Sequence, residues 1–177
     1  TSQCAAAPTT RNGGLWRSDD NGVTWTVQDV PTGTAAGVGA QVHDMVHSPD
    51  DATGNTLYVA VRSFPTAANG GIWKSTNAKG SPATFTKVAT GFANTTSASL
   101  GIRRITLGIG GPGSGGTLYA ALGNTSSNLW GLYKTTDGGA HWEKIALPVV
   151  KPMPVRALAI DPHDPKTAYA GIPQTGI

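Results

Sequence analysis

The stretch that decides the fold is Ser18-Asp19-Asp20-Asn21-Gly22-Val23-Thr24-Trp25, which recurs as Thr135-Thr136-Asp137-Gly138-Gly139-Ala140-His141-Trp142. Both copies fit the pattern Ser/Thr-x-Asp-x-Gly-x-x-Trp, and each follows a short apolar segment that begins with glycine. A short carboxylate accepts hydrogen bonds from turn N–H groups, glycine tolerates a positive φ, and the indole covers the turn. The pattern therefore predicts a β-hairpin that is closed by its own side chains. The expected structural residues are Ser18, Asp20, Gly22, Trp25, Thr135, Asp137, Gly139 and Trp142.

A third copy lies between these two and departs from the pattern. The segment Gly71-Ile72-Trp73-Lys74-Ser75-Thr76-Asn77 matches the start of the others, but Asn77 replaces the aspartate. An insertion at residues 78–84 then precedes Phe85, which takes the place of the tryptophan. We expect Ser75, Asn77 and Phe85 to serve a longer and looser hairpin.

A second pair of segments repeats between the hairpins. Alternating apolar residues occur at 42–49, 104–110 and 156–162, and each run is followed by a Tyr-containing strand at 57–60, 118–121 and 168–171. The glycine-led segments start 57 and 60 residues apart. Four short strands at such a period, with no helical pattern, are typical of a β-propeller blade. The sequence predicts an all-β chain: one partial propeller over residues 1–177, built from four-stranded antiparallel blades in approximate repeats 1–61, 62–122 and 123–177.

The hairpin motif resembles the Asp-box, or BNR repeat. That repeat is found in sialidases, in xyloglucan-cleaving endoglucanases built from paired propellers, in sortilin-type receptors and in a photosystem assembly factor with an arginine patch. The phrase Gly-Gly-Leu-Trp-Arg-Ser-Asp-Asp is similar to the xyloglucanase-like enzymes, but Arg11 and Ala68 stand where that family has an acid. The resemblance implies that any catalytic acids lie in other blades. It specifies a fold far better than a function.

Three repeats fall short of a closed propeller, which needs about four to eight blades. Residues 1–12 correspond to the loop between the second and third strands of a blade, and Gly176-Ile177 stands where a third strand would begin. We therefore expect either a piece of a larger propeller or a chain that a second copy completes head to tail into a six-bladed ring. The expected partners are accordingly the remaining blades or a second copy.

Composition limits the other partners. Charged residues make up 13% of the chain and the net charge of +3 comes with no basic run, so nucleic acid is not an expected partner. No apolar stretch approaches the roughly 20 residues that cross a bilayer, so we expect no membrane insertion. The single cysteine, Cys4, has no internal disulfide partner, and its role is left open. Sequons at Asn94 and Asn124 suit a secreted or extracytoplasmic protein.

Candidate ligand-binding residues lie where the alternating strands begin, because propeller ligands usually sit at the axial face. Aligning these strands places His43, Arg104 and Arg156 at one equivalent position, from which basic side chains would converge on a carboxylate, sulfate or phosphate. The alternative is that each arginine pairs with a local acid or carbonyl group. Trp130 precedes its strand and is a candidate for stacking on a sugar ring.

Catalytic residues are harder to find. A glycosidase needs two facing carboxylates, and outside the turns only Asp44, next to His43, is a weak candidate; the histidines show no metal-ligand spacing, and we expect neither a metal nor a cofactor. We predict part of a secreted carbohydrate-active propeller, either a glycoside hydrolase or a glycan-binding module that takes a polysaccharide or glycan. The alternative is a non-enzymatic scaffold that binds an acidic protein or a small anionic ligand. A carboxylate pair at the axial face would favour the enzyme, and a basic mouth without acids would favour the scaffold.

Overall fold

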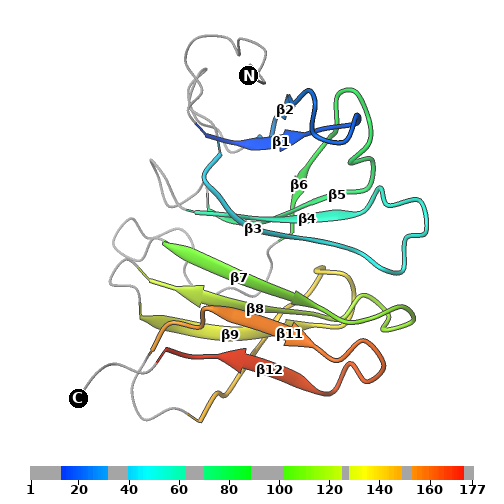
Figure 1. Cartoon of the computed structure of the whole chain (residues 1–177). Helices are drawn as coiled ribbons and strands as arrows, with labels where there is room; N and C mark the ends of the chain where they lie inside the picture. Colours follow the sequence, from blue (N-terminus) through cyan, green and yellow to red (C-terminus); the bar gives the residue numbers. More distant parts are fainter. Residues whose placement is uncertain are drawn as a thin grey trace.

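The computed structural model describes residues 13–31, 40–62, 70–88, 102–124, 128–148 and 153–173. These residues form twelve strands in four antiparallel sheets, and no helix occurs among them (Figure 1). No segment of this part of the chain is therefore a helix long and apolar enough to cross a membrane. The predicted all-β chain with four-stranded antiparallel sheets is confirmed.

Two of the sheets are complete meanders of four strands. One runs in the order β3 (Val42–His47), β4 (Leu57–Val61), β5 (Gly71–Ser75) and β6 (Thr86–Lys87). The other runs in the order β7 (Arg104–Ile109), β8 (Leu118–Gly123), β9 (Leu129–Thr135) and β10 (Glu143–Ile145). Each strand pairs with the next one along the chain, so the order of strands in each sheet follows the order in the sequence.

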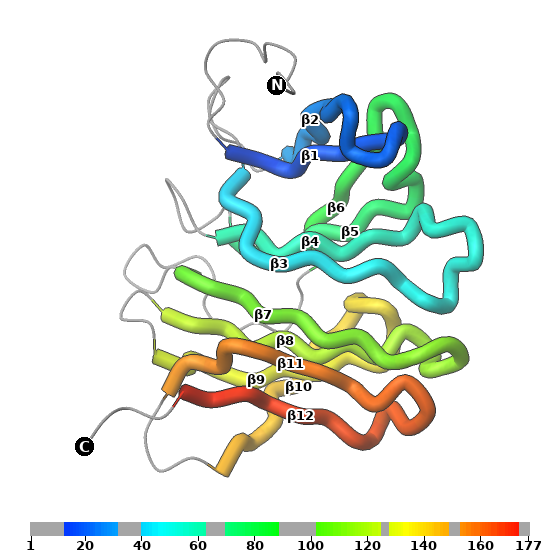
Figure 2. The backbone as a smooth tube through the Cα atoms, in the orientation of Figure 1, coloured from blue at the N-terminus to red at the C-terminus, as the bar shows by residue number. Residues whose placement is uncertain are grey.

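The other two sheets contain two strands each. β1 (Leu15–Arg17) pairs with β2 (Thr26–Gln28), and β11 (Ala157–Ile160) pairs with β12 (Ala168–Gly171). By sequence, β1 and β2 match the third and fourth strands of a complete sheet, whereas β11 and β12 match the first and second. The two half-sheets lie at opposite ends of the stack (Figure 2).

The sheets stack through their first strands. β7 contacts β3 on one side and β11 on the other, so these three strands run side by side through the molecule (Figure 1). Gly108 of β7 allows the close approach, because a Cβ at this position would lie 3.2 Å from the Cβ of Leu158. Such face-to-face stacking of small sheets around inner strands is a propeller-like arrangement.

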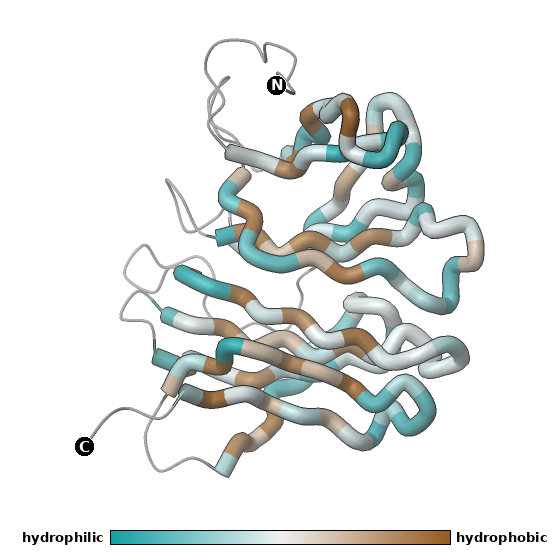
Figure 3. The backbone as a smooth tube through the Cα atoms, in the orientation of Figure 1, coloured by the Kyte–Doolittle hydropathy of each residue, from teal (hydrophilic) through white to brown (hydrophobic). Residues whose placement is uncertain are grey.

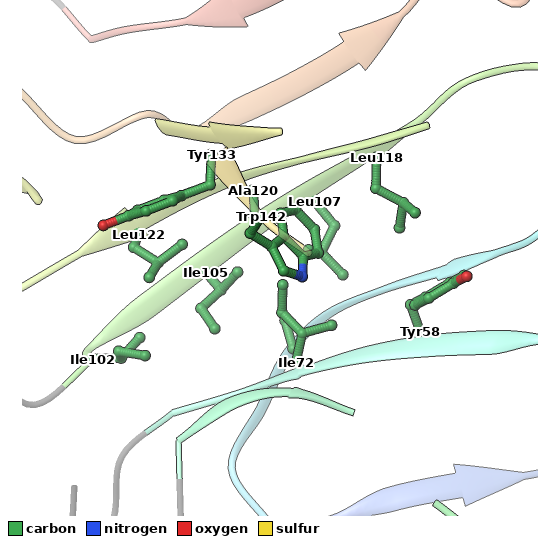
Figure 4. Packing of buried hydrophobic residues seen from close by; sticks show 11 residues of the cluster. Tyr58, Ile72, Ile102, Ile105, Leu107, Leu118, Ala120, Leu122, Tyr133 and Trp142 are labelled. Carbon is green, nitrogen blue, oxygen red and sulfur yellow. The ribbon is translucent and has the colours of Figure 1, made fainter. Parts of the chain in front are cut away.

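The core lies between the sheets rather than within one of them. The largest cluster joins the two complete sheets: Tyr58, Ala60, Ile72, Ile102, Ile105, Leu107, Leu118, Ala120, Leu122, Tyr133 and Trp142 are all buried there (Figure 4). A second cluster joins β1 to the β3–β6 sheet through Leu15, Val59, Trp73 and Phe85. Hydrophobic residues recur along the strands, and the turn between β11 and β12 is hydrophilic (Figure 3). Every sheet therefore needs a neighbour to cover its faces.

The β9–β10 hairpin is held by side chains of its own turn. The Thr135 hydroxyl donates to Asp137 Oδ1 at 2.7 Å and accepts the Gly139 N–H at 3.1 Å. Asp137 Oδ1 also accepts the His141 N–H at 3.0 Å. The Trp142 indole closes the turn by donating from Nε1 to the Gly139 carbonyl at 3.1 Å, and glycine is suited to this position because its φ is +94°.

The β1–β2 hairpin repeats these bonds. Asp20 Oδ1 accepts the Ser18 hydroxyl and the Thr24 N–H, both at 2.8 Å, and Trp25 Nε1 donates to the Gly22 carbonyl at 3.1 Å. These bonds, led by those from Thr24, lower the pKa of Asp20 from its usual 3.8 to about 2. The two hairpins differ in burial: Trp142 is 6% exposed and Trp25 is 45% exposed.

The β5–β6 hairpin is longer, as the insertion predicts, but it keeps the same bonding plan. Asn77 Oδ1 accepts the Ser75 hydroxyl at 3.2 Å and the Thr84 N–H at 2.9 Å, so the amide oxygen replaces the carboxylate. Phe85 is 5% exposed and belongs to the core. The expected loosening is therefore not seen, because Asn77 reaches across the insertion.

Candidate basic site

A cavity of about 390 Å³ opens where the first strands begin and the second strands end. It is lined by His43, Arg62, Arg103, Arg104, Ala121, Leu122, Gly123, Pro154, Val155 and Arg156. The structure thus brings together the three basic residues singled out from the sequence and adds two more. Five basic residues line one space, and none of the residues that line it is acidic.

His43 occupies an irregular position in β3. Val42 pairs with Val61 and Asp44 pairs with Ala60, so His43 is the extra residue of a β-bulge. Burial, followed by the charges of Arg104, Arg62 and Arg103, lowers the pKa of His43 below its usual value of 6.5. The imidazole is therefore neutral at neutral pH and becomes charged only in acid.

Arg104 and Arg156 enter the cavity from neighbouring sheets. Arg104 Nε donates to the Thr106 hydroxyl at 3.4 Å, and that hydroxyl donates to the Val155 carbonyl at 3.3 Å, next to Arg156. The Arg156 N–H donates to the Gly171 carbonyl at 2.8 Å, and its side chain is exposed. These bonds link Arg104 on β7 to the segment that leads into β11.

The predicted equivalence of the three strands is wrong by one residue. Tyr119 pairs with Gly108 and Tyr169 pairs with Ala159 at the same place in their strands. Counting back from these pairs, Val155 rather than Arg156 corresponds to Arg104. The two arginines still line one cavity because they belong to different sheets, whose stacking brings the strand ends together.

Arg62 and Arg103 were missed from the sequence. Arg62 follows β4 directly, and its N–H donates to the Gln41 carbonyl at 2.9 Å; the Arg103 N–H donates to the Gly123 carbonyl at 2.9 Å. Both residues therefore extend the pairing of the first and second strands by one step. The sequence offered one signal for them: both lie at the ends of strands, on the side where propeller ligands usually sit.

The cavity combines a basic rim with an apolar wall. Leu122 and Val155 are buried, and Ala121 is 3% exposed. The guanidinium groups beside this wall can donate charge-assisted, bidentate hydrogen bonds to an anion. The arrangement can hold a carboxylate, sulfate or phosphate group, and the role of these residues in ligand binding stays a prediction.

Asp44, the weak candidate for a catalytic acid, links two sheets instead of lining the cavity. Its Oδ2 accepts the N–H of Leu107, on β7, at 2.9 Å, and its Oδ1 accepts the Met45 N–H at 2.9 Å. The carboxylate therefore satisfies a donor on the first strand of the next sheet. This geometry gives Asp44 a structural role.

Asp50 forms a second link of this kind, and Asp51 shapes the turn beside it. The carboxylate of Asp50 accepts N–H groups of Gly113 and Gly116, which belong to the turn of the next sheet. Asp51 accepts bonds from Thr53 and Thr56, and these bonds hold its pKa well below the usual range. No described residue pair offers two carboxylates facing each other across the cavity.

Trp130 does not reach the cavity. It is half-buried on β9 and packs against the large core cluster. Within the described ranges no three His, Cys, Asp or Glu residues lie together as metal ligands. Cys4, Arg11 and Ala68 lie outside these ranges.

Comparison with known proteins supports the fold. No protein-family model matches the chain, and no curated protein matches it either. The chain is similar to the crystal structure of a GH74 xyloglucanase from Xanthomonas campestris, with a TM-score of 0.59 and 20% sequence identity. The match covers 88% of this chain and 22% of the xyloglucanase, so the chain spans about a fifth of that protein's length.

Proposed function

We propose that this chain forms part of a β-propeller that binds an anionic saccharide, through its carboxylate or sulfate groups, in the basic cavity. The observation that carries the proposal is the convergence of His43, Arg62, Arg103, Arg104 and Arg156 on one cavity without an acidic residue among its lining. A cavity lined by basic residues without a carboxylate pair favours binding of an anion over hydrolysis of a glycosidic bond.

The saccharide part of the proposal rests on the fold. The structural neighbour is a xyloglucanase, and the cavity volume of about 390 Å³ falls within the range that small ligands occupy. The two bonded turns at Asp20 and Asp137 support the further proposal that the hairpins are Asp-boxes. A secreted location stays a prediction from the sequons.

A second candidate function is a glycoside hydrolase, and the xyloglucanase neighbour favours it. In that case the catalytic acids would lie outside these residues, because Asp44 is engaged with Leu107. The two candidates differ in ligand: the hydrolase takes a neutral glucan chain, whereas the basic cavity selects an acidic one.

Calorimetric titration of the full chain distinguishes them. The probes are a galacturonic acid oligomer, a sulfated disaccharide and a neutral xyloglucan oligosaccharide. We expect both anionic probes to bind and the neutral one not to bind. Arg104→Gln and Arg156→Gln should each weaken binding by roughly tenfold or more, since a hydrogen bond to a charged group contributes about 1.5–3 kcal/mol. Binding should also strengthen as the pH falls through the lowered pKa of His43, where the imidazole gains charge.

Lys166→Gln is the matched control, because it removes one positive charge from the exposed β11–β12 turn, outside the cavity. Its affinity should stay within about twofold of the unmodified chain, since distant exposed charges are screened. Equal losses in all three variants would show non-specific attraction and would contradict the site. Binding or cleavage of the neutral probe, unchanged in the arginine variants, would replace the proposal with the hydrolase.

A further inference from the structure

The basic residues of the cavity come from three different sheets. His43 and Arg62 belong to the β3–β4 end of the first complete sheet, Arg103 and Arg104 to the start of β7, and Arg156 to the segment that leads into β11. β7 contacts β3 on one side and β11 on the other, and stacked sheets lie about 10 Å apart (Figure 1). The cations are therefore attached on both sides of β7 rather than to one strand.

Two cations outside the cavity hold neighbouring sheets together. Arg17 Nη1 donates to the carbonyls of Ala78 and Gly80, at 2.9 and 2.8 Å. The Lys74 ammonium donates to the Gly138 carbonyl at 3.4 Å. Each of these cations thus binds the backbone of the hairpin in the next sheet, which is a structural role.

The cavity arginines Arg104 and Arg156 differ from these structural cations. Arg17 also forms an ion pair with Asp19, at 2.9 Å, whereas neither cavity arginine forms an ion pair with a described carboxylate. The bond from Arg104 Nε goes to the neutral hydroxyl of Thr106, at 3.4 Å. The cavity therefore holds positive charge that the described part of the protein does not neutralise.

The charges around the cavity act on one another. Burial, and after it the charges of Arg104, Arg62 and Arg103, lower the pKa of His43. The arginines of the first two sheets thus produce one positive field at this imidazole. Each anionic group that enters the cavity relieves part of this repulsion, so a second group still gains from the charge that the first leaves unbalanced.

One anionic group cannot occupy all of these donors. A carboxylate has about four acceptor sites, and one guanidinium fork donates two parallel bonds to it. Two arginines therefore saturate one carboxylate, and four arginines line the cavity. The buried side chains of Leu122 and Val155 add an apolar surface, against which the C–H groups of a sugar ring can pack.

Building on the proposed function, we propose that the cavity binds a saccharide segment with at least two anionic groups, which arginines of different sheets hold. Arg62 and Arg156 serve different groups, because they lie on opposite sides of β7, and Arg103 and Arg104 lie between them on the middle sheet. The ligand class is a chain in which acidic units follow one another, and a sugar with a single acid binds weakly.

Calorimetric titration of the full chain with digalacturonic acid and with its monomethyl ester tests the proposal. The two probes have the same length, but the ester has one carboxylate instead of two. We expect the ester to bind roughly tenfold more weakly or worse, because it loses a charge-assisted bidentate pair. Galacturonic acid, which also has one carboxylate, should bind no better than the ester. This comparison of ligands needs no variant and is independent of any effect on folding.

Arg62→Gln and Arg156→Gln test whether the two groups are held at different places. Each variant should weaken binding of digalacturonic acid by roughly tenfold or more. At least one of the two should change the affinity for the ester by no more than about twofold, since a single acid needs only one of the two places. Lys166→Gln, in the exposed β11–β12 turn outside the cavity, is the matched control and should change neither affinity by more than about twofold.

The outcomes separate this proposal from the proposed function. Equal affinities for digalacturonic acid and its ester, both lost in Arg104→Gln, would overturn the requirement for two groups and leave binding of an anionic saccharide standing. A difference between the two probes that persists in both Arg62→Gln and Arg156→Gln would place the second charge outside the cavity and would also overturn the requirement. Failure of every acidic probe to bind would overturn the proposed function, and this proposal with it.

Discussion

Replacing Asp44 by alanine tests whether this carboxylate serves structure or chemistry. The change leaves the N–H of Leu107 without its partner, and Leu107 is 3% exposed. A buried donor that loses its only acceptor costs about 1–3 kcal/mol, whereas the exposed Met45 N–H is satisfied by water at little cost. We therefore expect Asp44→Ala to lower the free energy of unfolding by about 1–3 kcal/mol, or the melting temperature by roughly 2–12 °C for a chain of this size.

Urea denaturation at a fixed protein concentration measures this loss, with the slope of the transition checked for each variant. Asp44→Asn is the matched control, because the amide oxygen still accepts the Leu107 N–H; it should recover most of the lost stability. Neither variant should change the affinity for the anionic probes by more than about twofold. A stable Asp44→Ala chain that has lost binding or cleavage of a saccharide would refute the structural role and restore Asp44 as a catalytic candidate.

Three more outcomes follow from the hairpins and the stacking. Trp142→Ala should lower the free energy of unfolding by about 3–5 kcal/mol in a denaturation experiment, because its indole is buried. Trp25→Ala should lower it by less than half as much, because its indole is exposed. Equal losses would show that the two indoles do not differ in burial. The bonds that lower the pKa of Asp20 stabilise its turn fully above its usual 3.8, and this stability should be lost as the pH falls through about 2, which an NMR titration of the hairpin amides would follow. Gly111→Ala should lower the melting temperature, since a Cβ there would lie 1.9 Å from the Pro162 carbonyl oxygen; an unchanged melting temperature would show that the two turns are not in contact.

Local patterns predicted the strands well. The alternating run at 42–49 contains β3 (Val42–His47), and the Tyr-containing run at 57–60 lies within β4 (Leu57–Val61). The turn at Asp137 was also predictable, because the bonds of its carboxylate span no more than four residues. Alternation and turn chemistry act over a few residues, and the sequence shows both directly.

Features that depend on pairing or packing with residues outside the local run of sequence were less accessible. The bulge at His43 arises where β3 meets β4, and no spacing in the sequence marks it. Arg62 and Arg103 become part of the site only when two sheets are stacked, and the link from Asp44 to Leu107 crosses 63 residues of chain. Trp130, the candidate for stacking on a sugar ring, is half-buried against the large core cluster. Each of these outcomes depends on residues outside the local pattern from which the strands were predicted.

The junctions between sheets have an evolutionary consequence. Tyr58, Lys74 and Arg17 donate to the main-chain carbonyls of Gly138, Ala78 and Gly80, not to side chains of the next hairpin. Every residue carries a carbonyl group, so a duplicated unit can dock on its neighbour before any matching substitution has arisen. The β5–β6 hairpin illustrates this, because the carbonyls of Ala78 and Gly80, which lie in its insertion, accept the bonds from Arg17.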